Sequence, residues 1–309
     1  MNLQQLEYIV ALDTHRHFAR AAEACGVSQP TLSSLIQKLE EELDAVLFDR
    51  SCKPIVPTAI GRRVIDQARV VLYNIESLRL LTVSEREQNS GKVHIGIIPT
   101  VAPYILPCLF RQMRETQPQI ELRVSEMRTA VIVEQLKKAE LDMAILVTPL
   151  EREELLEIPL YYEKFVAYVS PKEALYDEAE IAPSALPTDH LWVLKEGHCM
   201  RSQVFNLCEN SSAVFSTIYE AGSIDTLVKI VDENGGCTII PELHLPLLSE
   251  AQKQHVRPLL EPVPVREVSL VIRRDYLRER IINSLVGAVK AIIPDSMIDA
   301  RLRKFAVRL

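Results

Sequence analysis

The sequence lacks the long apolar runs and ligand spacings that define several large classes of protein. No apolar stretch approaches the roughly 18 to 20 residues of a membrane span, and the first residues have neither a basic start nor an apolar signal core. We therefore expect a cytoplasmic chain. The six cysteines form no CxxC pair and no His/Cys ligand pattern, which argues against a structural zinc site and a disulfide-stapled secreted fold. We expect no metal and no cofactor.

Catalytic motifs and net positive charge are also missing. There is no P-loop, no GxGxxG and no Ser-His-Asp order, so we expect no enzyme. The formal net charge of −7 gives no overall indication of nucleic-acid binding, which would have to depend on local arrangement. The 309 residues suffice for two or three compact units, each with its own core.

The first sixty residues follow the order of a helix-turn-helix. Apolar residues predict one helix over residues 3–12, a second that ends at Gly26, and a third that Ser28 caps and whose first turn tolerates Pro30. The apolar spacing in the third helix predicts a buried face made of Leu32, Leu35, Ile36 and Leu39. Its other face carries small polar groups of the kind that read base edges and phosphates in a major groove: Gln29, Thr31, Ser33, Ser34, Gln37 and Lys38.

The charges of this segment leave a plainer alternative open, namely a capped surface helix. Residues 1–60 are net −3, with five cations against eight acids: Arg16, Arg20, Lys38, Arg50 and Lys53 against Glu7, Asp13, Glu23, Glu40, Glu41, Glu42, Asp44 and Asp49. Phosphate contacts would therefore need a few placed groups, which are Lys38, Arg50, Lys53 and helix N-termini.

The spacing of these residues is that of a known family. The segments Phe18-Ala-Arg-Ala-Ala22, Val27-Ser-Gln-Pro-Thr-Leu-Ser33 and Ile36-x-x-Leu39-Glu40-x-x-Leu43-x-x-x-Leu47-Phe48-x-Arg50 resemble the winged helix-turn-helix of LysR-type transcriptional regulators. The resemblance implies an all-α winged DNA-binding domain over residues 1–58. It implies base contacts from Gln29, Pro30 and Ser33, and backbone contacts from Thr31, Ser34, Gln37, Lys38, Arg50 and Lys53.

A helix with a near-heptad pattern follows Thr58. Its apolar positions have steps of 4, 4, 3, 4 and 3: Ile60, Val64, Ala68, Val71, Ile75 and Leu78. The pattern lasts under three heptads, so a single helix packed within its own chain is an equal alternative. The resemblance favours a dimerisation helix in a linker over residues 59–90, which polar residues 85–91 end.

From Lys92 the sequence alternates strands and helices. We predict strands at 93–98, 120–125 and 141–147 and near 165–170, 191–194, 237–240 and 268–273. We predict helices at 104–115, 130–138, 224–234 and 277–292. Such alternation favours parallel sheets covered on both faces. The expected α/β effector domain over residues 91–309 has two Rossmann-like subdomains, as in periplasmic binding proteins, with a cleft between them.

Two threonines stand where such folds bind ligands. Thr100 follows the first strand and Thr129 the second, and ligands bind outside the carboxyl ends of parallel strands. Either one alone is more simply a helix N-cap, whereas the pair is suited to hold a small polar molecule.

Cys199 and Cys208 lie nine residues apart, and His198 and Arg201 flank the first. In a helix the rise between the two cysteines would be about 13.5 Å, and they would lie on opposite faces. A disulfide needs Cα atoms within about 7 Å, so it would require the helix to unwind. Cationic neighbours favour a reactive thiolate. The plainer alternative is two buried core cysteines.

A second resemblance is carried by Gly96-x-Ile98-Pro-Thr-Val-x-Pro-Tyr104 with Leu106-Pro107, by Gly197-His-Cys-x-Arg201 and by the cysteine spacing. These resemble the peroxide-sensing OxyR branch of the LysR-type regulators. The resemblance implies Cys199 as reactive and Cys208 as resolving cysteine, peroxide-orienting Thr100 and Thr129, and support from His198, Arg201 and Arg266. Ser202 stands where the branch has an acidic residue, and the region around Ile218 lacks an expected histidine.

The branch implies a redox-sensing regulator that responds to hydrogen peroxide through a reversible Cys199–Cys208 disulfide. Its implied partners are operator DNA, further copies of the chain as a homodimer or homotetramer, and RNA polymerase. One alternative is a LysR-type regulator that binds a metabolite in the cleft, with structural cysteines. Another is a thiol peroxidase, which a DNA-reading domain disfavours.

Overall fold

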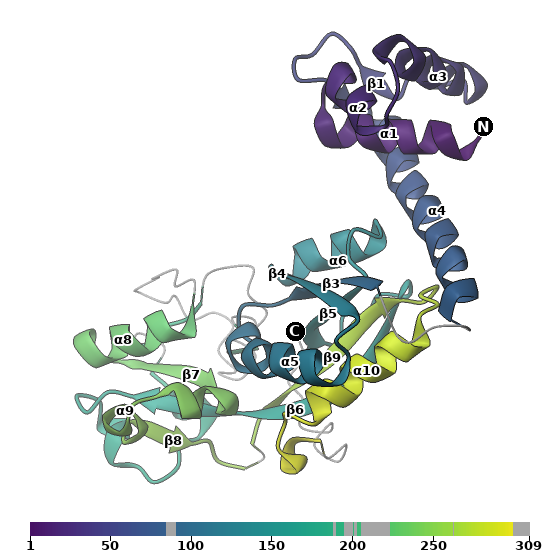
Figure 1. Ribbon diagram of the computed structural model, residues 1–309. Helices are drawn as coiled ribbons and strands as arrows, with labels where there is room; N and C mark the ends of the chain where they lie inside the picture. The colour runs from purple at the N-terminus through teal and green to yellow at the C-terminus, as the bar shows by residue number, and fades with distance from the viewer. Residues whose placement is uncertain are drawn as a thin grey trace. The chain divides into compact units, whose positions relative to one another are not determined.

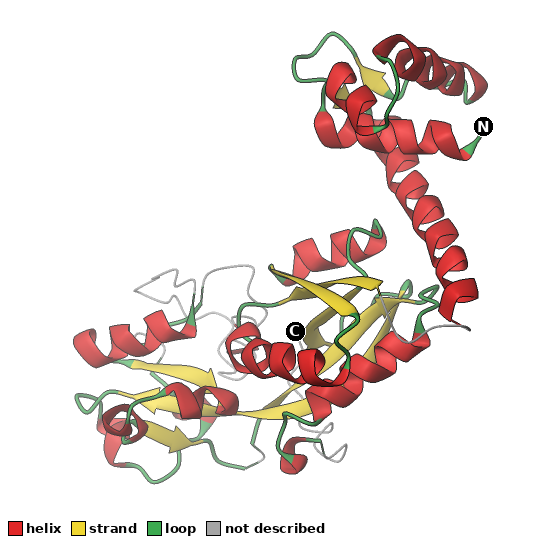
Figure 2. Ribbon diagram, in the orientation of Figure 1, coloured by secondary structure: helices red, strands yellow, loops and turns green. Residues whose placement is uncertain are grey.

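The computed structural model describes residues 1–84, 91–187, 190–194, 200, 203–204, 223–261 and 263–298 (Figures 1 and 2). It divides into two compact units. The first comprises Met1–Gln88 with Lys137–Glu140, and the second comprises Asn89–Leu136 with Leu141–Leu309. The boundaries 1–58, 59–90 and 91–309 remain predictions.

The first unit begins with three short helices and a small ribbon. They are α1 (Leu3–His15), α2 (Phe18–Ala24), α3 (Gln29–Glu42), β1 (Phe48–Asp49) and β2 (Val56–Pro57), followed by the long α4 (Ala59–Ser84). The Ser28 hydroxyl accepts a hydrogen bond from the Thr31 N–H at 3.3 Å, so the predicted cap is present. Gly26, with φ of 67°, makes the left-handed turn between α2 and α3. The antiparallel ribbon β1–β2 forms the wing.

The core of the first unit uses the predicted face of α3. Leu32, Ile36 and Leu39 are buried among apolar residues of α1, α2 and α4, and Leu35 packs against them. Ala68 of α4 is buried in the same core, whereas Ile60 is 43% and Leu78 62% exposed. The apolar stripe of α4 is therefore divided, because its middle packs within the chain and its ends do not.

The second unit is built on one seven-stranded sheet in the order β4-β3-β5-β9-β6-β7, with β8 paired to β6. Its strands are β3 (Gly91–Ile97), β4 (Ile120–Glu126), β5 (Met143–Thr148), β6 (Leu155–Val169), β7 (Cys237–Pro241), β8 (Val256–Pro258) and β9 (Val265–Arg273). The α-helices bounded in the described part of the unit are α5 (Ala102–Thr116), α6 (Thr129–Lys137), α8 (Ile224–Asn234), α9 (Glu250–Lys253) and α10 (Glu279–Lys290). The same residues include the 3₁₀ turns η1 (Ala174–Asp177), η2 (Pro183–Ala185), η3 (Glu242–Leu247) and η4 (Asp295–Met297).

The expectation of parallel sheets is only half right. β3 pairs in parallel with β4 and β5, as predicted. The other pairings are antiparallel, because β9 returns between β5 and β6, and β7 and β8 both pair against β6. In place of a strand at 191–194, Leu191 forms an isolated parallel bridge with Cys237.

β6 is fifteen residues long and joins two halves of this unit. Its first part pairs with β9, and its last part, Phe165–Val169, pairs with β7. In Figure 1, β7, β8, α8 and α9 lie around one end of β6, while β3, β4 and β5 lie toward the other. The crossing between the halves therefore falls near Glu163 and its cross-strand neighbour Arg266.

Several predicted features lie outside the described residues. They are Cys199, Cys208, His198, Arg201, Ser202, Ile218 and the linker residues 85–90. From the segment 197–208 the structure describes Met200, Gln203 and Val204, which are helical and buried. Across the described residues, no helix is long and apolar enough to cross a membrane, and no cluster of three potential metal ligands occurs.

Candidate functional site

The residues expected to touch DNA form one surface on α3 and the wing. Eight of them are exposed, and only Ser33 is half-buried: Gln29, Pro30, Thr31, Ser33, Ser34, Gln37, Lys38, Arg50 and Lys53. Most lie within α3, and Arg50 and Lys53 lie in the connection between β1 and β2. The Thr31 hydroxyl is 2.8 Å from that of Ser28, so the cap also orients a predicted backbone contact.

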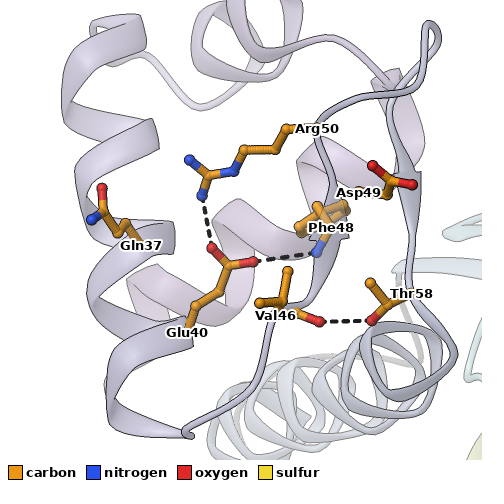
Figure 3. A pocket seen from close by; sticks show the side chains of 7 residues that line it. All are labelled: Gln37, Glu40, Val46, Phe48, Asp49, Arg50 and Thr58. Carbon is orange, nitrogen blue, oxygen red and sulfur yellow. Dashed lines mark hydrogen bonds and ion pairs between the residues drawn. The ribbon is translucent and has the colours of Figure 1, made fainter.

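A hollow of about 570 Å³ separates α3 from the start of the wing (Figure 3). At its side, Glu40 of α3 accepts hydrogen bonds from the backbone N–H groups of Leu47 at 2.8 Å and Phe48 at 3.2 Å. Its second oxygen lies 2.7 Å from Arg50 Nη2. The Arg50 guanidinium also lies 5.6 Å from the centre of the Phe18 ring. Arg50 is thus held by α2 and α3 while remaining exposed.

The wing turn is ordered by Asp49. Its carboxylate accepts hydrogen bonds from the Ser51 N–H at 2.9 Å and the Ser51 hydroxyl at 2.6 Å, and from the Cys52 thiol at 3.4 Å. The Ser51 hydroxyl in particular lowers the pKa of Asp49. This negative charge therefore stays in the wing, beside the cations proposed to meet phosphate.

A second polar site lies at the crossing of the effector unit. Arg266 of β9 and Glu163 of β6 are fully buried, with Arg266 Nε and Nη2 both 2.7 Å from Glu163 Oε2. Arg266 also donates to the Thr100 hydroxyl at 3.1 Å and to the Thr100 carbonyl at 2.9 Å. Burial raises the pKa of Glu163, and Arg266 offsets part of that rise. The structure thus brings together two of the five predicted peroxide-site residues.

The same site is tied to the second half of the unit through η3. The Leu243 N–H donates to Glu163 Oε1 at 2.9 Å, and Nδ1 of buried His244 lies 2.9 Å from the Tyr104 hydroxyl of α5. Burial lowers the pKa of His244. The contact between His244 and Tyr104 joins η3 to α5.

The two threonines differ in their surroundings. Thr100 is 3% exposed, and the plainer alternative of a helix N-cap does not hold for it, because Val101 is the N-cap of α5 and no side chain caps that helix. Thr129 is half-buried at the first residue of α6. Within the described chain Thr129 contacts neither Thr100 nor Arg266 through a hydrogen bond. The two threonines nevertheless follow the carboxyl ends of the neighbouring parallel strands β3 and β4. A hydrogen bond from the Met127 N–H to the Ile97 carbonyl joins the two strand ends.

Two important residues, Glu163 and Glu40, carried no assigned role in the sequence. Glu163 stands beside Lys164 in β6, and Arg266 stands beside Glu267 in β9, so the local sequence does not show that Glu163 pairs with Arg266. Glu40 was noted only as part of a motif. Its position next to buried Leu39 was the available indication that it faces inward.

An exposed helix-turn-helix surface joined to an α/β unit with a buried polar site defines a DNA-reading regulator with a sensing domain. Two family models match: the bacterial regulatory helix-turn-helix protein of the lysR family over residues 3–62, and the LysR substrate binding domain over residues 86–293. The chain belongs to the LysR family of transcriptional regulators, in its OxyR branch.

Relatives match across almost the whole chain. A hydrogen peroxide-inducible genes activator of Haemophilus influenzae is 36% identical over 95% of this chain and 99% of its own length. The DNA-binding transcriptional dual regulator OxyR of Escherichia coli K12 is 36% identical, covering 88% of this chain and 90% of its own. Full-length OxyR from Pseudomonas aeruginosa, solved as a variant, gives a TM-score of 0.80 at 33% identity, over 94% of this chain and 95% of that one.

Proposed function

We propose that this protein is a redox-sensing transcriptional regulator that responds to hydrogen peroxide through a reversible disulfide between Cys199 and Cys208. The observation that carries the proposal is the match over nearly the full length to relatives named as hydrogen peroxide-inducible activators. A peroxide-bound cysteine mutant of OxyR from Corynebacterium glutamicum, at 26% identity and a TM-score of 0.63, adds support across 94% of this chain and 92% of that one.

The DNA contacts follow from the exposed surface of α3 and the wing. Gln29, Pro30 and Ser33 would face base edges in the major groove, because they lie at the start of the recognition helix. The other exposed polar groups would hold the phosphate backbone: Thr31, Ser34, Gln37, Lys38, Arg50 and Lys53. The net negative charge of residues 1–60 makes these few contacts responsible for most of the phosphate attraction.

In the sensing reaction, the Cys199 thiolate attacks one peroxide oxygen. A sulfur–oxygen bond forms, the oxygen–oxygen bond breaks, and the departing hydroxide takes a proton to become water, leaving a sulfenic acid. The Cys208 thiol then attacks the sulfenic sulfur with loss of a second water, which gives the disulfide. Both cysteines are oxidised and one peroxide is reduced. Reduction by an external thiol would restore the starting state.

The geometry at Thr100 supports its proposed role in holding peroxide. Arg266 Nη1 donates to the Thr100 hydroxyl oxygen at 3.1 Å. An oxygen that accepts from the guanidinium directs its own hydrogen elsewhere, so the Thr100 hydroxyl is set to donate to a ligand oxygen. Thr129, His198 and Arg201 would complete the peroxide site. The proton that the departing hydroxide takes up would come from the Thr100 hydroxyl and its hydrogen-bonded neighbours or from solvent.

The metabolite alternative fits this site less well. A carboxylate effector needs an uncompensated cation or several free N–H donors. Arg266 is instead paired with the buried Glu163 carboxylate at 2.7 Å, which would repel a second carboxylate. An uncharged ligand such as hydrogen peroxide meets no such repulsion.

The proposal also covers the oligomeric state of the protein and its place in the cell. The exposed ends of the α4 stripe, at Ile60 and Leu78, are available to a second copy, so we infer a homodimer or homotetramer that presents two readers to one operator. Regulation from an operator implies contact with RNA polymerase and a cytoplasmic setting. The peroxide is used once for each switching event, so the protein acts as a regulator and not as an enzyme.

The test is to map the cysteines by mass spectrometry after sub-stoichiometric peroxide. A rapidly formed Cys199–Cys208 link, reversed by a thiol reductant, is the expected result. Cys208→Ser should stop at the sulfenic acid, and Cys199→Ser should show no link. If Cys199 stays unmodified while DNA binding persists, the effector is another molecule. A Cys208→Ser protein that still switches fully would remove the resolving step.

A further inference from the structure

We propose that Glu40 is a positioning residue of the DNA reader, which acts by holding Arg50 of the wing in the orientation used on DNA. The proposal rests on the DNA contacts of the proposed function, and adds a residue that touches no DNA itself. The Glu40 side chain is only 11% exposed, although it lies on α3 between residues of the reading surface.

The first step is that the two oxygens of the Glu40 carboxylate make different contacts. One oxygen accepts from the backbone N–H groups of Leu47 and Phe48, which fixes the chain as it enters β1. The other oxygen pairs with Arg50 Nη2 at 2.7 Å. Figure 3 shows the Glu40 and Arg50 side chains pointing toward one another across the hollow between α3 and the wing.

The second step is that the same backbone segment is held from its other side. The Thr58 hydroxyl donates to the Val46 carbonyl at 2.7 Å, and the Thr58 N–H donates to the Leu47 carbonyl at 2.9 Å. Gly61 of α4 packs so closely that a Cβ there would lie 1.9 Å from the Leu47 carbonyl oxygen. The entry to the wing is therefore held by Thr58 and α4, and Glu40 has its remaining effect on the exposed Arg50 side chain.

The third step is how the Arg50 guanidinium is shared. It has five N–H donors, and the contact with Glu40 uses Nη2. The remaining donors are available to phosphate, while Phe18 covers one face of the group at 5.6 Å. Holding a long, exposed side chain before DNA arrives reduces the ordering cost that binding would otherwise carry.

A competing effect has the opposite sign. Glu40 is also a negative charge near the phosphates, so its removal strengthens DNA binding by general electrostatics. A matched charge change separates the two effects. Glu23 lies exposed on α2, and within the described part of the chain its side chain forms no hydrogen bond or ion pair, so Glu23→Gln removes the same charge without touching Arg50.

The experiment measures binding of the full-length protein to a fluorescent duplex, chosen as the one that the wild-type protein enriches from a randomised library. Glu40→Gln keeps an oxygen for the Leu47 and Phe48 N–H groups but loses the ion pair with Arg50. We expect it to bind about three- to tenfold more weakly than Glu23→Gln. Its salt slope should match that of wild type, because Arg50 still reaches phosphate once ordered.

The dependence on Arg50 decides the proposal. In an Arg50→Met background, Glu40→Gln and Glu23→Gln should bind equally. Arg50→Met alone should weaken binding and lower the salt slope by about 0.9, which tests the proposed phosphate contact separately from Glu40. Binding by Glu40→Gln as tight as by Glu23→Gln would overturn the positioning role, and so would a deficit that persists without Arg50.

Discussion

Replacing Arg266 with methionine would leave the Glu163 carboxylate buried without its counter-charge. Both side chains are fully buried, so water cannot take the place of the guanidinium. A carboxyl group in such a site folds in its protonated form instead. With a reference pKa of about 4.3, protonating it costs about 3.7 kcal/mol at pH 7 and about 1 kcal/mol at pH 5.

A double variant isolates the free-energy cost of burying the Glu163 carboxyl group without its counter-charge. Arg266→Met with Glu163→Gln has no charge to neutralise, yet the amide oxygen can still accept from the Leu243 N–H. The lost contacts of Arg266 with Thr100 are common to both variants and cancel. We expect the single variant to be less stable than the double by about 3 to 4 kcal/mol at pH 7 and by about 1 kcal/mol at pH 5.

The sign follows from linkage. The folded-state pKa of Glu163 in the single variant is raised above its unfolded value, so its stability declines as pH rises above about 4.3. The assay is urea unfolding of the full chain, followed by the fluorescence of its single tryptophan. Trp192 packs against the core of the effector unit, so the signal reports this unit. A gap between the two variants that does not change with pH would refute the reasoning.

Two further predictions concern the close approach in the DNA reader and the buried histidine. Gly61→Ala should weaken DNA binding at least tenfold without changing Trp192-detected unfolding, because its Cβ would overlap the Leu47 carbonyl. The control, Gly287→Ala in α10, places its Cβ in open space and should stabilise the effector unit by about 0.5 to 1 kcal/mol. Equal DNA affinities of the two variants would contradict the expected effect of Gly61→Ala. Burial lowers the pKa of His244, so the unfolded state binds the extra proton and wild-type stability should fall as pH drops below about 6.5. His244→Gln should show a shallower fall between pH 7.5 and 5.5 in urea unfolding, and parallel curves would count against a buried neutral histidine.

Much of the reader could be predicted because its determinants are local. Ser28 and Pro30 mark the start of α3, and the apolar spacing of Leu32, Ile36 and Leu39 assigns its buried face within a single helix. The effector strands that follow a helix in sequence, such as β4 and β5, were also placed from local pattern. In each case the deciding residues lie within one or two turns of one another.

The sheet order and the buried polar site could not be read in this way. Glu163 and Arg266 are 103 residues apart, and nothing near either residue indicates which charge lies opposite. The antiparallel place of β9 between β5 and β6 depends on that same distant pairing. The contact of Thr100 with Arg266 could not be predicted either, because the two residues lie 166 positions apart in the chain.

The strand order has a consequence for the newly made chain. β5 emerges from the ribosome early, and one of its edges is completed only by β9, which is synthesised after about a hundred further residues. At roughly 5 to 20 residues per second, that edge waits for several seconds or longer. Every residue of β5 is buried in the finished fold, and all but Thr148 are apolar, so the waiting strand is open to pairing with another nascent chain. Chaperone dependence during synthesis should therefore be greatest between the completion of β5 and the arrival of β9.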